Sequence, residues 1–108
     1  MPTFLTNFVY TGESWQKLAK KPEDRSVPVT ALMAKLGGRL ISMYYMAGDY
    51  DGFIIYELPD AKVAATAVIA VGLVGHIRTL KTSQLYTVNE SMELLSNAGK
   101  LAFPAPKG

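Results

Sequence analysis

The sequence predicts a single α+β domain in which four antiparallel strands carry two helices on one face, the ferredoxin-like arrangement. A length of 108 residues is the usual size of one domain. The predicted elements follow the order strand, helix, strand, strand, helix, strand, which is that of a split βαβ unit. Hydrophobic residues make up 49% of the chain and charged residues 19%, as in a packed globule. We assign residues 1–98 to this domain and expect an irregular tail over 99–108.

Alternating residues predict the first strand and indicate that both of its faces are apolar. Residues 3–10 are rich in β-branched and aromatic side chains at a period of two. One face carries Phe4, Phe8 and Tyr10, and the other carries Leu5 and Val9. A sheet with one face in water alternates more cleanly, so we expect this strand to be covered on both sides.

A helix broken by proline is expected next. Turn and cap residues over 11–14 precede apolar positions spaced three and four apart, which predicts a helix. Pro22 and Pro28 lack a backbone donor and clash with the preceding helical turn, so the helix should break or kink between them. We expect Ser26 to cap the second piece and the Gly37-Gly38 pair to end it.

A hairpin and a second helix follow in the predicted order. Residues 39–46 and 53–58 are strand-like, and the turn formers between them predict a hairpin. In the first of these strands, simple alternation places Leu40 and Tyr44 on the same face. Asp60 is expected to cap the apolar helix that follows. The apolar run is much shorter than the roughly 20 residues of a bilayer span, so no membrane anchor is expected.

A fourth strand and a short third helix complete the predicted elements. The strand is expected over residues 76–86, with a bend near Thr82-Ser83. Thr87 and Glu90 have the spacing of a capping box, and Gly99 suits the end of a helix.

The second apolar face of the sheet needs a cover. For a chain of this length we expect the same face of a second copy, giving a two-fold dimer closed around a barrel-like interior. The alternative is that the third helix or the tail folds across the face within one chain.

Charge and cysteine content exclude several functional classes. The net charge is only +2, and acids directly follow the one tight basic group, Lys17, Lys20 and Lys21, so nucleic acid is not an expected partner. The absence of cysteine excludes disulfides, thiolate metal sites and a cysteine nucleophile. Residues 1–10 lack the pattern of a signal peptide, and a cytoplasmic location is expected. Without paired histidines or a phosphate-binding loop, neither a metal nor a cofactor is expected.

Candidates for acid and base chemistry are few. Asp49, Tyr50 and Asp51 lie in the hairpin turn, where a carboxylate could act as a base while the phenol orients an oxygen. The alternative is structural: the aspartates cap the turn and Tyr50 packs over it. His76 is the only histidine, so any histidine chemistry at neutral pH must use it. A structural or solvent-exposed histidine is the alternative reading.

Candidates for ligand binding are aromatic and basic. We expect an apolar pocket between the sheet and the helices, lined by Tyr10, Tyr44, Tyr45 and Tyr50. Arg39 and Arg78 lie near strand starts and could hold an anion, because a guanidinium binds carboxylates in a bidentate fork. Ion pairing at the surface, with an acid such as Glu57, is the alternative.

The hairpin resembles that of a known family. The turn Gly48-Asp49-Tyr50-Asp51, preceded by Gly37-Gly38-Arg39-Leu40 and Tyr44-Tyr45 and followed by Glu57-Leu58-Pro59-Asp60, is similar to the GYD-domain family. The family is named for the Gly-Tyr-Asp residues of this turn, which match Gly48, Tyr50 and Asp51. The likeness extends from about Thr3 to Leu95, and the proline-broken first helix departs from it. The resemblance implies a ferredoxin-like fold of the dimeric α/β barrel type and implies no general reaction.

Three functions are compatible with these residues. The favoured one is a dimeric module that binds or senses a small apolar molecule in a tyrosine-lined pocket. The second is a cofactor-independent isomerase or monooxygenase acting on an aromatic or quinone-like substrate, which is an argument from fold analogy. The third is a structural or assembly protein without a ligand. Enzymes usually gather several titratable groups in an apolar cleft, and this chain offers few outside residues 49–51, which favours binding.

Overall fold

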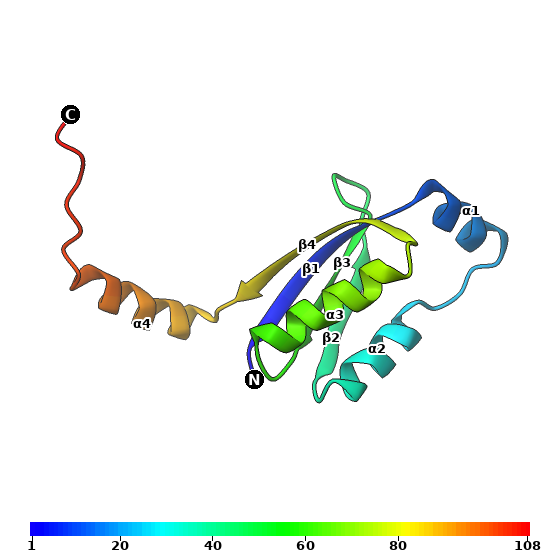
Figure 1. Cartoon of the computed structure of the whole chain (residues 1–108), viewed down its shortest axis with the longest axis horizontal. Helices are drawn as coiled ribbons and strands as arrows, with labels where there is room; N and C mark the ends of the chain where they lie inside the picture. Colours follow the sequence, from blue (N-terminus) through cyan, green and yellow to red (C-terminus); the bar gives the residue numbers. More distant parts are fainter.

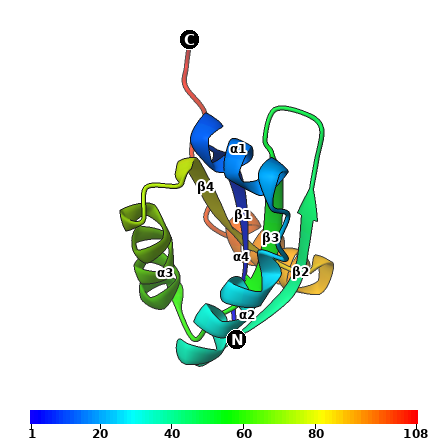
Figure 2. The same cartoon turned by 90° about the vertical axis from the view of Figure 1, so that its right-hand side faces the viewer.

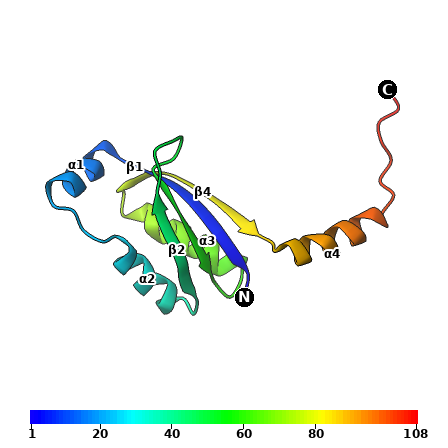
Figure 3. The same ribbon diagram turned by 180° about the vertical axis from the view of Figure 1, so that it is seen from behind.

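The computed structural model describes residues 1–108 and confirms the predicted α+β, ferredoxin-like fold. The elements are β1 (Thr3–Tyr10), α1 (Gly12–Lys20), α2 (Ser26–Lys35), β2 (Arg39–Tyr45), β3 (Gly52–Glu57), α3 (Ala61–Leu73), β4 (Ile77–Leu85) and α4 (Val88–Gly99). The strands pair antiparallel in the order β2-β3-β1-β4. Helices α2 and α3 cover one face of the sheet (Figures 1 and 2), and no helix crosses the other face (Figure 3).

The first helical region is divided in two, as the prolines predict. Lys21 is the C-cap residue of α1, and Pro22 follows it directly. Proline disfavours helical geometry in the residue before it. Pro28 lies in the first turn of α2, where its missing N–H would have had no helical partner. Ser26 was wrongly predicted as the cap. It is the first helical residue, and its N–H and hydroxyl donate to the Asp24 carboxylate at 2.9 and 2.5 Å. These bonds hold the pKa of Asp24 below its usual value.

The helix starts predicted at Asp60 and at Thr87 are confirmed. The Asp60 side chain accepts a hydrogen bond from the N–H of Val63 at 2.9 Å and begins α3. Thr87 and Glu90 form the capping box of α4, with bonds of 3.0 and 2.8 Å. Gly75 follows α3 with a φ of 82°, a left-handed conformation that favours glycine. No helix is both long and apolar enough to cross a bilayer.

The main core lies between the sheet and the helices α2 and α3. Strand β1 turns Phe4, Thr6, Phe8 and Tyr10 toward the helices, and none of these is more than 5% exposed. The core cluster is Phe4, Met33, Tyr56, Leu58, Ala64 and Ala67. The two alanines are fully buried on α3, and their small side chains leave room for the helix to lie close to the sheet.

A chain of hydroxyl groups runs from this core to Thr82, which is exposed on the edge strand β4. The hydroxyl oxygen of Thr6 lies 2.8 Å from that of Tyr56 and 2.8 Å from that of Thr82. Each buried hydroxyl therefore has a partner, which removes most of the cost of burying it. The predicted bend near Thr82-Ser83 is wrong, because β4 continues through both residues, opposite Thr6 and Leu5. Thr82, one of the polar residues that indicated a bend, instead bonds to Thr6 in this chain of hydroxyl groups.

Strand β2 departs from simple alternation. Its register against β3 shifts between Leu40 and Ser42, so Leu40 pairs with Tyr56 while Met43 pairs with Ile54. One extra residue in a strand reverses the facing of everything beyond it. The prediction that Leu40 and Tyr44 share a face is therefore wrong: Leu40 packs against the core, and Tyr44 lies on the opposite side.

The open face of the sheet carries apolar side chains from β1, as predicted, and from β2 and β3, and it also carries polar residues such as Asn7, Lys81 and Glu57. It carries Leu5, Val9, Tyr44, Phe53 and Ile55. Tyr44 is 61% exposed and stacks on Phe53 with ring centroids 5.6 Å apart. Neither α4 nor the tail folds across this face, because both extend away from the sheet (Figure 1). The alternative of a cover from within the same chain is therefore wrong.

Candidate functional site

A cavity of about 280 Å³ lies between the sheet and the helices α2 and α3. Of its 19 lining residues, 15 are hydrophobic. Strand residues such as Phe8, Met43 and Ile54 form the sheet side, and Val29 of α2 and Val71 of α3 contribute to the helix side. The volume lies just below the usual range for small-molecule sites of roughly 300 to 1,000 Å³. The cavity therefore suits a small, mainly apolar ligand.

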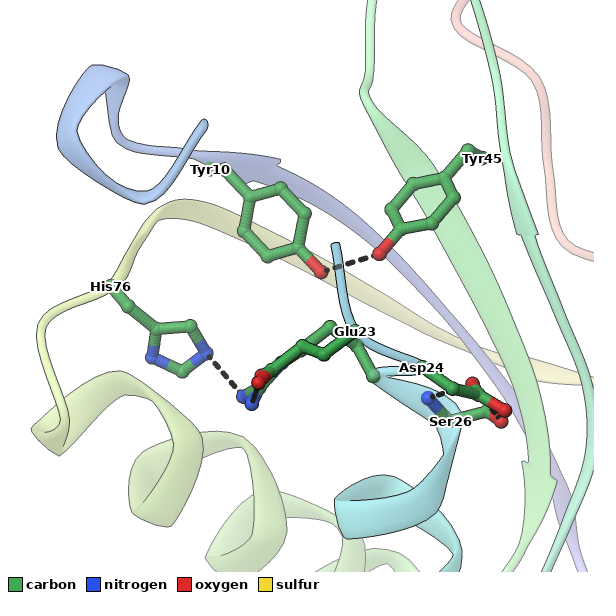
Figure 4. Close-up of polar contacts among 7 residues, drawn as sticks. Tyr10, Glu23, Asp24, Ser26, Tyr45 and His76 are labelled. Atoms are coloured by element: carbon green, nitrogen blue, oxygen red, sulfur yellow. Dashed lines mark hydrogen bonds and ion pairs between the residues drawn. The ribbon is translucent and has the colours of Figure 1, made fainter. Parts of the chain in front are cut away.

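Three aromatic or polar side chains lie at one end of this cavity, Tyr10, Arg25 and His76. Arg25 precedes α2, and its Nη2 atom lies 3.5 Å from Nε2 of His76. Figure 4 shows Tyr10 and His76 on neighbouring strand ends, with Tyr45 beyond them. The hydroxyl oxygens of Tyr10 and Tyr45 are 3.2 Å apart. Besides Tyr10, Arg25 and His76, only Thr6 and Tyr56 bring a hydroxyl or charged group to the cavity wall.

His76 is held in its neutral form. Partial burial first, and the positive charge of Arg25 second, lower the pKa of His76 below its ordinary value. When Arg25 donates to Nε2, the single imidazole proton resides on Nδ1. Nδ1 is shielded from solvent and has no hydrogen-bond partner. A neutral His76 thus offers an unused donor beside the cavity.

The Tyr10 hydroxyl is also held in its neutral form. Its pKa is raised, chiefly because the ring is buried and also because its hydroxyl bonds to that of Tyr45, while Arg25 acts weakly in the opposite direction. The ring packs edge-on against Trp15, with centroids 5.2 Å apart, and lies 5.1 Å from the ring of Phe8. Tyr10 is therefore a fixed, uncharged hydrogen-bonding group.

The shift at His76 predicts a specific pH dependence. Because the folded chain binds the His76 proton less readily than the unfolded chain, His76 contributes stability that is present above its unfolded pKa of about 6.5 and is lost as the pH falls toward its folded pKa. Replacing Arg25 with glutamine should raise the pKa of His76 only in part, since burial remains the larger cause. The single histidine makes the ring resonances unambiguous in an NMR titration. Lys17→Gln, which removes an exposed charge paired with Glu13, should leave the titration unchanged.

The hairpin turn lies outside the cavity. Asp51 fastens the turn to the end of β1, since its Oδ2 atom accepts from the Tyr10 N–H at 2.9 Å and from the Trp15 indole at 3.0 Å. Asp49 is exposed and Tyr50 is half-buried, and neither lines the cavity. None of the turn residues Asp49, Tyr50 and Asp51 therefore lines the cavity with His76.

The remaining candidate residues are distributed over several surfaces. Tyr10 lines the cavity, Tyr45 lies beside it, and Tyr44 is on the open face. Arg39 is exposed on the edge strand and pairs with Glu57 at 2.6 Å. Arg78 is exposed at the start of β4. Of the candidates proposed from sequence, only Tyr10 and His76 line the cavity.

Sequence reasoning missed Arg25. It lies in the break between α1 and α2, directly after Glu23 and Asp24, where a charged run is typical of a solvated surface. Its ion pair with Glu23, at 2.7 Å, fits that reading, yet the residue also reaches His76. The available signal was its place at a proline-bounded helix start, three residues before Pro28. No group of three histidine or carboxylate side chains is arranged to hold a metal ion.

The fold and the site define a class of protein: a small ferredoxin-like domain with an apolar cavity between its sheet and its helices. One end of this cavity carries an arginine and a histidine. The chain belongs to the GYD domain family, whose model matches residues 4–95. The resemblance of the hairpin is thereby confirmed. A curated relative from Thermus thermophilus, named "Glutamine synthetase and cystathionine beta-lyase binding protein", is 29% identical over 80 residues, which cover 74% of this chain and 84% of the relative.

Proposed function

We propose that this chain is a binding module that pairs with itself and takes a small, mainly apolar ligand in the cavity under α2 and α3. The observation that carries the proposal is the composition of the cavity wall, 15 hydrophobic residues out of 19 with Arg25 and His76 at one end. Apolar walls with a few placed polar groups are the usual design of small-molecule sites.

The polar end defines the chemistry of the ligand. Arg25 supplies a positive charge, and the Nδ1 proton of His76 lacks an acceptor. A ligand oxygen at this end would accept from the Arg25 guanidinium, and a carboxylate would gain the most because hydrogen bonds between charged groups are stronger. The proposed ligand therefore has an apolar body and one terminal oxygen acceptor, most favourably a carboxylate.

Self-pairing is part of the same proposal. The open face carries Leu5, Val9, Phe53 and Ile55, which are only half-buried in a single chain, and the more exposed Tyr44. A contiguous apolar surface of this kind marks an interaction site, and a two-fold pairing would cover both copies at once. We place this dimer in the cytoplasm, where a chain without cysteine needs no oxidising compartment.

The two alternative functions have less support. A cofactor-independent isomerase or monooxygenase would need several acid or base groups at the cavity, and of the candidates Asp49, Asp51 and His76 only His76 lines it. An assembly protein without a ligand gives no reason for a cavity with an unpartnered histidine nitrogen at its wall.

The test uses a fatty acid as a probe and a matched pair of variants. Decanoate should bind more tightly than decanol, and Arg25→Gln should remove most of that difference, whereas Arg78→Gln should not.

Ala70 and Ala65 are both exposed on α3, but only Ala70 lines the cavity. Ala70→Phe should therefore weaken decanoate binding at least about 10-fold, as expected for loss of more than about 1.4 kcal/mol, and Ala65→Phe should not change it. Isothermal titration calorimetry measures all four. Equal binding by the two α3 variants would exclude this cavity as the site.

Native mass spectrometry of the purified chain, first under gentle and then under denaturing conditions, reads ligand and assembly together. A dimer that carries an added mass released on denaturation supports both parts of the proposal. A dimer without any added mass, and without affinity for decanoate, favours the assembly function.

A protein partner is a second candidate function, because α3 presents an uncovered apolar patch at its carboxyl end. Ile69, Leu73 and Val74 are 62%, 81% and 72% exposed. The relative from Thermus thermophilus is named for binding two enzymes, and this patch is where such a contact would form here. Binding of purified glutamine synthetase, measured by interferometry and abolished by Leu73→Glu but not by Ala65→Glu, would support it. Lack of binding by the unsubstituted chain would count against this candidate.

A further inference from the structure

Helix α4 forms an arm that extends away from the rest of the chain (Figure 1). It follows β4 after only two residues, Tyr86 and Thr87, and extends past the end of the sheet (Figures 1 and 3). It packs on no other element of the chain. The capping box at Thr87 fixes the start of the helix, so the arm is a formed helix that lacks a surface to lie on.

The arm is amphipathic. Val88, Met92 and Leu95 are spaced four and three residues apart and share one face. All three are more than 60% exposed. The polar face carries Asn89, Glu93 and Asn97. A helix with one exposed apolar stripe usually buries that stripe against another surface.

The size of the exposed surface shows how much cover is missing. The chain exposes 7834 Å², whereas a compact monomer of 11.8 kDa exposes about 5,900 Å². The excess is about 1,900 Å², more than the roughly 800 Å² that one partner loses in a standard interface. The radius of gyration, 17.4 Å, likewise exceeds the about 13 Å expected for this length. A single copy therefore exposes enough excess surface to form a standard protein interface.

The same chain also has an uncovered receiving surface, the open face of the sheet. Its apolar side chains lie beside Lys81, which shares this face as the partner of Asn7 and forms no ion pair. The arm is acidic, with Glu90 and Glu93 and no basic residue between Val88 and Gly99. Opposite charge favours contact with this face, and an acidic helix is a poor match for an anionic membrane surface.

We infer that α4 of each copy packs its Val88, Met92 and Leu95 stripe on the open sheet face of a second copy of this chain. The exchange is reciprocal about a two-fold axis, so each copy donates one arm and receives one. This inference deepens the self-pairing in the proposed function by naming the element that covers the face. It does not depend on the ligand cavity.

The experiment compares two double variants of the full chain. Met92→Glu with Leu95→Glu adds two carboxylates to the apolar stripe, and Asn89→Glu with Asn97→Glu adds two to the polar face of the same helix. Because α4 packs on nothing within its own chain, neither pair should disturb the fold, which circular dichroism verifies. Sedimentation equilibrium should show a dimer for the unsubstituted chain and for the polar-face variant, and an at least 100-fold weaker dimer for the stripe variant. Tyr44→Ser, on the receiving face, should weaken the dimer at least 10-fold.

Each other outcome overturns the inference in a distinguishable way. A dimer that survives in the stripe variant means that the sheets pair without the arm, which leaves the proposed self-pairing intact. A dimer lost equally in both double variants assigns the effect to charge and not to the stripe. If Tyr44→Ser leaves the dimer dissociation constant unchanged, the arm packs on a surface other than the open sheet face. A monomer at all concentrations overturns this inference and the self-pairing together, while decanoate binding can still be tested on its own.

Discussion

Replacing Gly38 with alanine is expected to destabilise the domain severely. A Cβ atom at this position would lie 1.9 Å from the carbonyl oxygen of Glu57 and 2.9 Å from Cδ2 of Leu58. The first contact is with backbone that pairs β3 to β2 at Arg39, and Leu58 is fully buried, so neither neighbour can move freely. The free energy of unfolding should fall by at least about 3 kcal/mol, with a melting temperature lower by on the order of 10 °C or more.

Gly48→Ala is the matched control for that substitution. Gly48 belongs to the turn that names the family, yet nothing lies within 4 Å of a Cβ built on it, and its φ is not positive. Its effect should stay within about 0.5 kcal/mol. Urea unfolding of both variants at one protein concentration measures the difference. Comparable losses at the two glycines would contradict the steric account of Gly38.

The contrast between these glycines shows which part of the fold was readable from sequence. Helix caps such as Asp60 and Thr87 were predicted because capping depends on residues three positions apart. The steric demand at Gly38 arises from β3, a strand that lies 14 or more residues further along the chain. No local pattern carries that information.

The register shift in β2 has the same origin. Alternation placed Tyr44 with Leu40, and the irregularity between Leu40 and Ser42 moved it to the opposite face. Bulges are set by pairing with a neighbouring strand, here β3, and every strand residue past the shift is affected. The apolar character of both faces was still predictable, because β1 pairs with both neighbours and alternates cleanly along its length.

The candidate site divides in a similar way. Tyr10 and His76 were chosen for their residue types and strand ends, and the fold brings both to the cavity. Arg25 was not chosen from the sequence, because its position depends on how the chain turns between α1 and α2. A proline pair predicts that a helix breaks there, but it does not predict the direction in which the following residues point. Contacts between segments 51 residues apart, such as Arg25 with His76, come only from the folded chain.

Replacing Asp51 with alanine should lower the free energy of unfolding by about 2 to 3 kcal/mol. The Asp51 carboxylate accepts from the N–H of Tyr10 and from the indole of Trp15. Tyr10 is only 5% exposed, so its N–H would be left buried without a partner. The backbone bonds of Asp51, which donates to Phe8 and accepts from Met46, do not involve the side chain and should persist. Urea unfolding followed by the fluorescence of Trp15, the single tryptophan, reports both the global loss and the local contact.

Two controls separate a structural role of Asp51 from a catalytic one. Asp51→Asn keeps an acceptor oxygen in place and should recover most of the lost stability, because the two donors need an oxygen and not a charge. Asp49→Ala removes the neighbouring carboxylate, which is exposed and bonds to nothing, and should change stability by less than about 0.5 kcal/mol. If Asp51→Ala were as stable as Asp49→Ala, the carboxylate would not be what fastens the turn to β1, and its place in the family's signature would need another explanation. The expected order, with Asp51→Ala far below the other two, makes this aspartate the structural tie that holds Tyr10 at the end of the cavity.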